Sequence, residues 1–151
     1  MEQSVPLILA YIGMALMLML TSLGSAIGVT NAGNTAIGVN KINSKIFGPA
    51  MILCALPSTQ GLYGFAAFFL MLNRIQEITV LTLNQSLAIC VTGLALGVVG
   101  LWSALKQASL ISNGIIEMAN GQDVFGRTMI LAVFPELYAI LTFAATFLAL
   151  P

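Results

Sequence analysis

The sequence of 151 residues contains no histidine, two cysteines and one tryptophan, and only 7% of its residues are charged. The lack of histidine removes the commonest metal ligand and the usual acid–base side chain at neutral pH. A soluble domain carries about 25% charged residues, so this scarcity of charge excludes an ordinary water-soluble protein. The five basic and five acidic residues cancel, which gives no electrostatic reason to expect a nucleic-acid partner. Cys54 and Cys90 lie in apolar segments, where inert thiols are favoured over a metal site or a disulfide.

Long apolar runs separate the few charges, and hydrophobic residues make up 59% of the chain. A membrane-spanning helix needs about 20 apolar residues, and lipid forces the backbone to satisfy its own hydrogen bonds. The sequence therefore predicts an all-α membrane protein with four transmembrane helices, at 5–28, 47–72, 80–106 and 128–150. The polar stretch 29–46 is predicted to continue the first helix beyond the bilayer.

The chain is an internal duplication. Shifting the sequence by 78 residues aligns its two halves without a gap over much of their length. We therefore predict two fused helical hairpins, 1–78 and 79–151, with both chain ends on one side of the membrane. In this register Ser58 takes the place of Glu136. The matched pairs include Leu23 with Leu101, Ser25 with Ser103, Phe47 with Phe125 and Pro57 with Pro135.

The two hairpin turns carry several of the charges. Lys41 and Lys45 lie in the first turn, and Glu117, Asp123 and Arg127 lie around the second. The excess of positive charge on cytoplasmic loops predicts cytoplasmic turns and chain ends outside.

Small residues recur at helical spacing in the first and third predicted helices. Gly24 and Gly28, and likewise Gly93 and Gly97, are four residues apart, a spacing that allows helix backbones to approach closely. One interpretation is general packing of a four-helix bundle. The sharper one places helices 1 and 3 in a crowded inner layer with helices 2 and 4 outside.

The second predicted helix carries a polar stripe. Leu56, Thr59, Gln60 and Tyr63 follow the spacing of one helix face. Pro57 lacks a backbone N–H and disturbs the hydrogen-bond ladder, which leaves carbonyl oxygens of this turn available. Polar side chains at this depth of an apolar helix indicate either a binding site or hydrogen bonds that hold helices together.

Glu136 is the one acidic residue in the middle of a predicted span. Gln107 lies 14 residues before Gly121 and Glu136 lies 15 after it, so antiparallel helices bring the two side chains level. A charge at the bilayer centre costs about 2.5–3.5 kcal/mol, and a proton or a cation is needed to neutralise it. With the oxygens of Thr59 and Gln60, the set suits a hard monovalent cation, and Tyr63 can donate to the second carboxylate oxygen.

Two segments carry a resemblance to a known family. Leu56-Pro-Ser-Thr-Gln-Gly-Leu-Tyr-Gly-Phe65 and Glu136-Leu-Tyr-Ala-Ile-Leu141 resemble the membrane-rotor proteolipid of V-type ATPases, the K or c-ring subunit, in its bacterial sodium-translocating form. The resemblance implies a ring of identical, non-catalytic subunits that rotates against a membrane stator subunit supplying a basic residue. It also implies ATP hydrolysis in a soluble head, and a central-stalk subunit that we expect at the turns 41–46 and 119–126.

The resemblance further implies the ligands of the carried ion. They are the Leu56 backbone carbonyl and the side chains of Thr59, Gln60, Gln107 and Glu136, with Tyr63 locking the carboxylate. The complete oxygen set favours Na⁺, and H⁺ is the alternative because a proton needs only the carboxylate.

Two neighbours of these ligands bear on the ion. Lys106 is expected either to supply a cation itself or to extend along the inner wall, and Pro135 is expected to bend the fourth helix.

Two readings from other classes stay open. A small proton-coupled multidrug antiporter would need an aromatic substrate pocket near the carboxylate, which the single Trp102 supports poorly. A purely structural membrane protein would leave Glu136 without a role.

Overall fold

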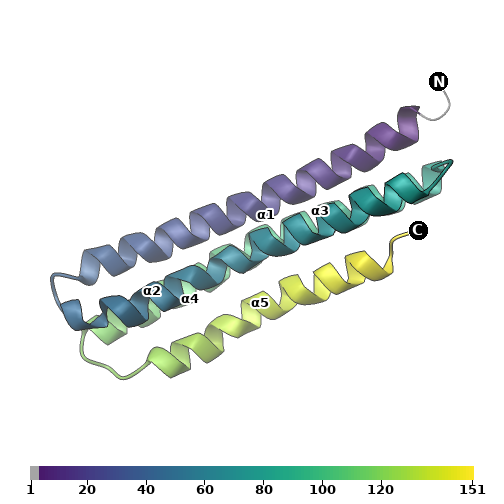
Figure 1. Ribbon diagram of the computed structural model, residues 1–151. Helices are drawn as coiled ribbons and strands as arrows, with labels where there is room; N and C mark the ends of the chain where they lie inside the picture. The colour runs from purple at the N-terminus through teal and green to yellow at the C-terminus, as the bar shows by residue number, and fades with distance from the viewer. Residues whose placement is uncertain (1–3) are drawn as a thin grey trace.

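The chain folds into long antiparallel helices, and the computed structural model describes residues 4–151. The N-terminal end of α1 and the C-terminal end of α5 lie at one end of the bundle, and the two hairpin turns lie at the other (Figure 1). Four helical segments are long and apolar enough to cross a membrane, so the predicted all-α class with four spans is confirmed. The elements are α1 (Ser4–Val39), a 3₁₀ turn (Ser44–Ile46), α2 (Phe47–Ala55), a 3₁₀ turn (Leu56–Ser58), α3 (Thr59–Glu77), α4 (Leu83–Ala119) and α5 (Phe125–Leu148).

The helices α1 and α4 are longer than a bilayer requires. The 36 residues of α1 span about 54 Å, against about 30 Å for the hydrocarbon core. The predicted continuation of the first helix is therefore confirmed as far as Val39. The predicted third span, 80–106, falls on α4, which begins at Leu83 and continues beyond the predicted span to Ala119. Ile111, Ile115 and Met118 in this extension remain buried against the first hairpin.

The second span is interrupted at Pro57, where the sequence predicts a disturbed hydrogen-bond ladder. Pro57 has no N–H to donate, and the chain tightens into a 3₁₀ turn over Leu56–Ser58. In this turn the Leu56 N–H donates to the Leu53 carbonyl, and the Thr59 N–H donates to the Leu56 carbonyl. Beyond the turn, α3 continues to Glu77. The fourth helix occupies Phe125–Leu148, close to the predicted range.

The second hairpin turn is set by a glycine. Gly121 has φ of 91°, a left-handed conformation that glycine adopts without steric cost. Its N–H donates to the Met118 carbonyl at 3.1 Å, and the Gln122 N–H donates to the Glu117 carbonyl at 3.0 Å. This pair of bonds is a Schellman motif, which ends α4 and reverses the chain.

The helices α1 and α4 pack with their backbones in close contact, as the glycine spacing predicts. A Cβ atom placed on Gly24 would lie 2.6 Å from the Leu101 Cα, and one on Gly93 would lie 2.9 Å from the Gly13 carbonyl oxygen. Any side chain at these positions would separate the two helices. The remaining helices flank this pair, with α3 against α1 and α5 against α4.

The buried side chains form two apolar clusters with a polar layer between them. One cluster lies toward the turns and includes Leu53 and Ile115, and the other lies toward the chain ends and includes Met14 and Met71. Cys54 is buried in the first cluster, and both cysteines are free. The buried polar residues between the clusters are Thr21, Ser25, Gln60, Ser103 and Gln107.

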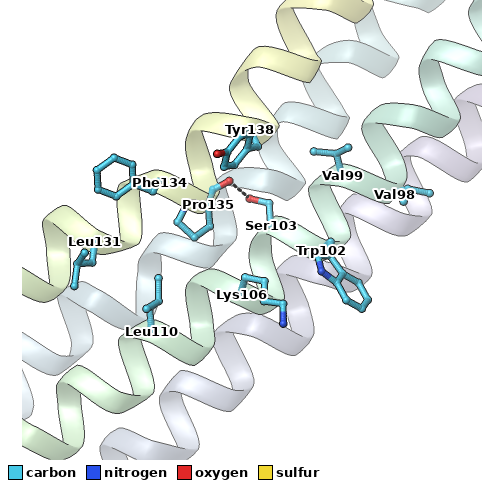
Figure 2. A pocket seen from close by; sticks show the side chains of 10 residues that line it. All are labelled: Val98, Val99, Trp102, Ser103, Lys106, Leu110, Leu131, Phe134, Pro135 and Tyr138. Atoms are coloured by element: carbon cyan, nitrogen blue, oxygen red, sulfur yellow. Dashed lines mark hydrogen bonds between the residues drawn. The ribbon is translucent and has the colours of Figure 1, made fainter.

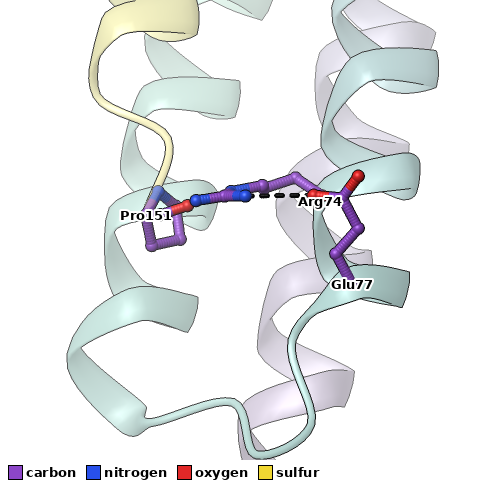
Figure 3. Close-up of polar contacts among 3 residues, drawn as sticks. All are labelled: Arg74, Glu77 and Pro151. Atoms are coloured by element: carbon purple, nitrogen blue, oxygen red, sulfur yellow. Dashed lines mark hydrogen bonds and ion pairs between the residues drawn. The ribbon is translucent and has the colours of Figure 1, made fainter.

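Polar contacts tie α3 to the segment after α5 at the end of the bundle away from the turns. The Arg74 guanidinium binds Glu77 Oε2 at 3.0 Å and donates from Nε to the Pro151 carbonyl oxygen (Figure 3). These groups are exposed, so the ion pair contributes little stability by itself. They show that the end of the second hairpin lies beside α3 of the first.

Candidate functional site

The Glu136 carboxylate is held by side chains from two other helices. The Tyr63 hydroxyl on α3 donates to Glu136 Oε1 at 2.7 Å, and Gln107 Nε2 on α4 donates to Glu136 Oε2 at 3.2 Å. Glu136 itself is only partly buried. Both carboxylate oxygens therefore have a donor, while one side of the group stays accessible from the outer face of the bundle.

Two glutamines connect the helices behind the carboxylate. Gln60 and Gln107 have no exposed surface, and Gln60 Nε2 donates to Gln107 Oε1 at 3.0 Å. Gln107 Nε2 also donates to the Ala132 carbonyl at 2.9 Å. The predicted common depth of these side chains is what the structure shows, because a chain of hydrogen bonds runs from α3 through α4 to Glu136 on α5.

Thr59 and the Leu56 carbonyl supply oxygen atoms beside the glutamines. The Thr59 hydroxyl is 3.0 Å from the Leu56 carbonyl oxygen and 3.3 Å from Gln60 Oε1. Three oxygens thus gather at the 3₁₀ turn that Pro57 creates. This oxygen-rich cluster is linked to the carboxylate through the two glutamines, and oxygens are the ligands that a hard cation takes.

Ser103 belongs to the same network, although the sequence did not single it out. Its hydroxyl accepts from Gln60 Nε2 at 3.0 Å and donates to the Pro135 carbonyl at 2.7 Å. The available signal was its position one helical turn before Gln107, on the same face of α4. Ser103 thereby satisfies the second N–H of Gln60, and no buried side-chain nitrogen or oxygen within 4–151 lacks a partner.

The two prolines of the duplicated hairpins have different local structures. Pro135 lies inside the uninterrupted helix α5, whereas Pro57 interrupts the second span. Side chains of α4 bind the carbonyls around Pro135, and such contacts allow a helix in lipid to tolerate proline. In the first hairpin Ser25, the counterpart of Ser103, instead accepts from the Gly61 N–H at 2.7 Å.

Lys106 points away from the carboxylate. Its side chain is exposed, and its ammonium lies 5.5 Å from the centre of the Trp102 ring. Figure 2 shows both residues on α4 in an apolar groove between α4 and α5. Among the described residues, the structure gives Lys106 no ion pair with Glu136. Of the two roles expected for Lys106, extension along the protein surface fits this geometry.

The groove bears on the antiporter alternative. It contains the aromatic side chains of Trp102, Phe134 and Tyr138, but Glu136 is not part of its lining. The carboxylate faces α3 through Tyr63. The aromatic groove and the Glu136 carboxylate thus lie on different faces of the bundle. This arrangement does not match a substrate pocket built around the carboxylate.

The family of the chain follows from comparison with known proteins. The sequence model of the ATP synthase C-subunit family matches it twice, at residues 12–71 and 90–149. The second match begins 78 residues after the first, which is the offset of the internal repeat. The two matches together cover well over half of the chain.

Two curated relatives agree with this result. The chain is 34% identical over 143 residues to the K subunit of the V-type sodium ATPase of Enterococcus hirae, a match that covers 94% of this chain and 90% of that protein. It is 37% identical over 135 residues to the K subunit of the A-type ATP synthase of Methanocaldococcus jannaschii. That match covers 89% of this chain but only 58% of the longer relative. The chain therefore belongs to the ATP synthase C-subunit family, as a multi-pass membrane proteolipid of the V-type ATPases with two copies of the family's hairpin.

Proposed function

We propose that this rotor proteolipid carries Na⁺ across the membrane, bound at Glu136, as one of many identical copies in a ring. ATP hydrolysis in a soluble head would turn the ring against a membrane stator subunit, and the chain itself performs no catalysis. The ligands would be the Leu56 carbonyl and the oxygens of Thr59, Gln60, Gln107 and Glu136. The name of the Enterococcus hirae relative, a sodium ATPase subunit, agrees with this choice of ion.

One observation carries the proposal. Glu136 is bonded by Tyr63 and Gln107, and the oxygens of the 3₁₀ turn stand next to the glutamine pair. A proton would need only the carboxylate. The combined supply of hydroxyl, amide and carbonyl oxygens within one chain is instead what a cation needs to replace its water shell.

The cost of charge in lipid explains how such a site drives directional transport. A loaded site is neutral and can pass through lipid, whereas an emptied Glu136 is anionic and costs several kcal/mol there. We propose that the empty site stays beside a basic residue of the stator until it is reloaded from the opposite half-channel. Rotation then moves ions in one direction.

The orientation and the remaining partners follow from the turns. Lys41 and Lys45 favour a cytoplasmic position of the turns by the positive-inside rule, with the chain ends outside and the protein in the cell membrane. The turns at 41–46 and 119–126 then face the central-stalk subunit. The units that repeat around the ring would be the hairpins 1–78 and 79–151.

A ring that carries H⁺ is the second candidate, because the partly exposed Glu136 is accessible to a proton as well. Labelling with a carbodiimide, which modifies the protonated carboxyl, separates the two ions. In the purified ring we expect NaCl to protect Glu136 at constant pH, while KCl at equal ionic strength gives no protection. If sodium leaves the labelling unchanged at every pH at which Glu136 reacts, the ring carries protons.

A further inference from the structure

An open groove runs between α4 and α5. It encloses about 630 Å³ and is almost wholly apolar, with Val98, Val99, Trp102 and Lys106 on α4 and Phe134 and Tyr138 on α5 (Figure 2). Trp102 and Tyr138 are 61% and 65% exposed. Apolar surface is ordinary in lipid, so exposure alone does not say what covers this face.

The internal repeat supplies that information. The groove residues Leu131 and Tyr138 correspond to Leu53 and Gln60 in the first hairpin, 78 positions earlier. Leu53 and Gln60 have no exposed surface, whereas Leu131 and Tyr138 are 50% and 65% exposed. The first hairpin therefore has a surface equivalent to the groove, and in the first hairpin this surface is buried.

The helix that covers it is α4. Leu53 packs in one cluster with Ile111 and Ile115, and Gln60 is bonded to Ser103. Since α4 is the first helix of the second hairpin, its own counterpart is α1. The repeat thus predicts that α1 of a next copy covers the groove of the second hairpin. A contact of this head-to-tail kind closes into a ring when the rotation allows it.

Individual contacts can be transferred in the same way. A Cβ on Gly24 would lie 2.6 Å from the Leu101 Cα, and one on Gly28 would lie 3.1 Å from the Ala104 carbonyl oxygen. Shifted by 78 positions, these pairs become Trp102 with Leu23 of the next copy, and Lys106 with Ala26 of the next copy. Leu23 and Ala26 are both exposed on α1.

The two halves of the repeat differ at this contact. Two glycines bring α1 and α4 together within the chain, but Trp102 and Lys106 replace them at the equivalent face of α4. Helical side chains lean toward the N-terminus, and the Lys106 ammonium accordingly lies over the Trp102 ring. On the next copy the same lean directs the ammonium one turn before Ala26, to Ser22, which is exposed.

We propose that Trp102 and Lys106 form a wide, polar joint between neighbouring copies, in which the Lys106 ammonium binds Ser22 on α1 of the next copy. The inference rests on the ring proposed above. The ring would then alternate between tight glycine contacts inside each chain and wider contacts between chains. Lys106 would serve assembly and not ion binding.

Cysteine cross-linking tests the position of the joint. In full-length chain with Cys54→Ala and Cys90→Ala, oxidation of the pair Leu23→Cys and Trp102→Cys should link successive copies into a ladder of multimers. The control pair Leu23→Cys and Val91→Cys should give no ladder, because Val91 is exposed on α4 but lies about 16 Å along the helix from Trp102.

The mass of the assembly before oxidation distinguishes a wrong contact between copies from the absence of a ring. A ring mass without a ladder from the Leu23 and Trp102 pair would overturn the joint and leave the ring in place. A monomer or dimer mass would overturn the proposed function itself.

A second measurement tests the role of the ammonium. Lys106→Met and Ser22→Ala should each raise the fraction of dissociated ring in a detergent titration about threefold, the usual size of a hydrogen bond within a membrane. The double variant should dissociate no more than either single one, since both lose the same bond. Lys106→Arg should keep the ring intact, and Lys41→Met in the turn should have no effect. Additive losses in the double variant would overturn the bond to Ser22.

Discussion

The Tyr63 hydroxyl donates a 2.7 Å hydrogen bond to Glu136 Oε1, from α3 to α5. The two residues are 73 positions apart in the sequence, and they come from different copies of the repeated hairpin. The ring of Tyr63 also packs on Phe143, with 6.1 Å between the ring centres. The tyrosine therefore covers part of the carboxylate and joins the two hairpins there.

Tyr63→Phe should weaken ion binding without unfolding the protein. The change keeps the ring contact and removes one hydrogen bond to a charged group, worth about 1.5 kcal/mol and thus about tenfold in affinity. The measurement is the Na⁺ concentration that gives half-protection of Glu136 against carbodiimide. Tyr11→Phe is the matched control, because Tyr11 is an exposed tyrosine on α1. Equal half-protection for both variants would show that Tyr63 does not hold the carboxylate.

Glu136→Gln should abolish ATP-driven ion uptake into membrane vesicles. An amide keeps the shape of the side chain but carries no charge that a cation or proton can cancel. The control is Glu117→Gln near the second turn, which should pump normally because Glu117 lies outside the site. Uptake at the normal rate by Glu136→Gln would remove the central element of the proposed mechanism.

Each chain should bind one Na⁺. The second hairpin has Glu136 and Gln107, while the equivalent positions of the first hairpin are Ser58 and Val29. The Ser58 hydroxyl is exposed and donates to the Ala55 carbonyl three residues earlier, so the first hairpin has no carboxylate at this position. One ion per four spans leaves more free energy per ion, which suits a pump. Counting bound ²²Na⁺ per chain in the purified ring checks this, and two ions per chain would contradict it.

Ser103→Ala should lower Na⁺ affinity about fivefold, although Ser103 is not a proposed ligand. Its loss leaves a buried N–H of Gln60 without an acceptor, at a cost of about 1 kcal/mol. Gln60 then shifts away from Gln107, and the half-protection concentration rises. Ser109→Ala, at an exposed position of α4, should leave affinity unchanged. If Ser103→Ala behaves like Ser109→Ala, the Ser103 bond does not position the glutamines.

Gly24→Ala should destabilise the chain by about 1–3 kcal/mol, because the new methyl group meets the backbone of Leu101 and neither helix can shift freely. Gly33→Ala on the same helix meets no atom within 4 Å and should be neutral or stabilising, since alanine favours helix. Unfolding in detergent and denaturant compares the two. Equal stability of both variants would show that α1 and α4 have room to separate.

Much of this structure could be predicted from the sequence because lipid leaves few alternatives. Polar residues such as Gln60 and Gln107 stand out in an apolar span, and the 78-residue repeat relates their depths. The spans themselves follow from the spacing of charges. What these signals predict is which residues share a layer.

The sequence did not reveal which of two adjacent residues is buried, or which of the two aligned prolines interrupts its helix. Lys106 and Gln107 are adjacent, yet one is exposed and the other fully buried. Pro57 and Pro135 align in the repeat, but only Pro57 breaks its helix, because the partners of the surrounding carbonyls differ between the two hairpins. Such outcomes depend on side chains of other helices, which a single segment does not contain.

The two apolar clusters at either end of the polar layer have one more consequence. Within residues 4–151 they fill the interior of the bundle on either side of the polar layer, so an ion would not pass along the bundle axis. If the chain carries an ion as proposed, release would occur sideways, past the hydroxyl of Tyr63 and the partly exposed Glu136. The surface that meets the outer flank of α3 and α5 would then control when the ion is released.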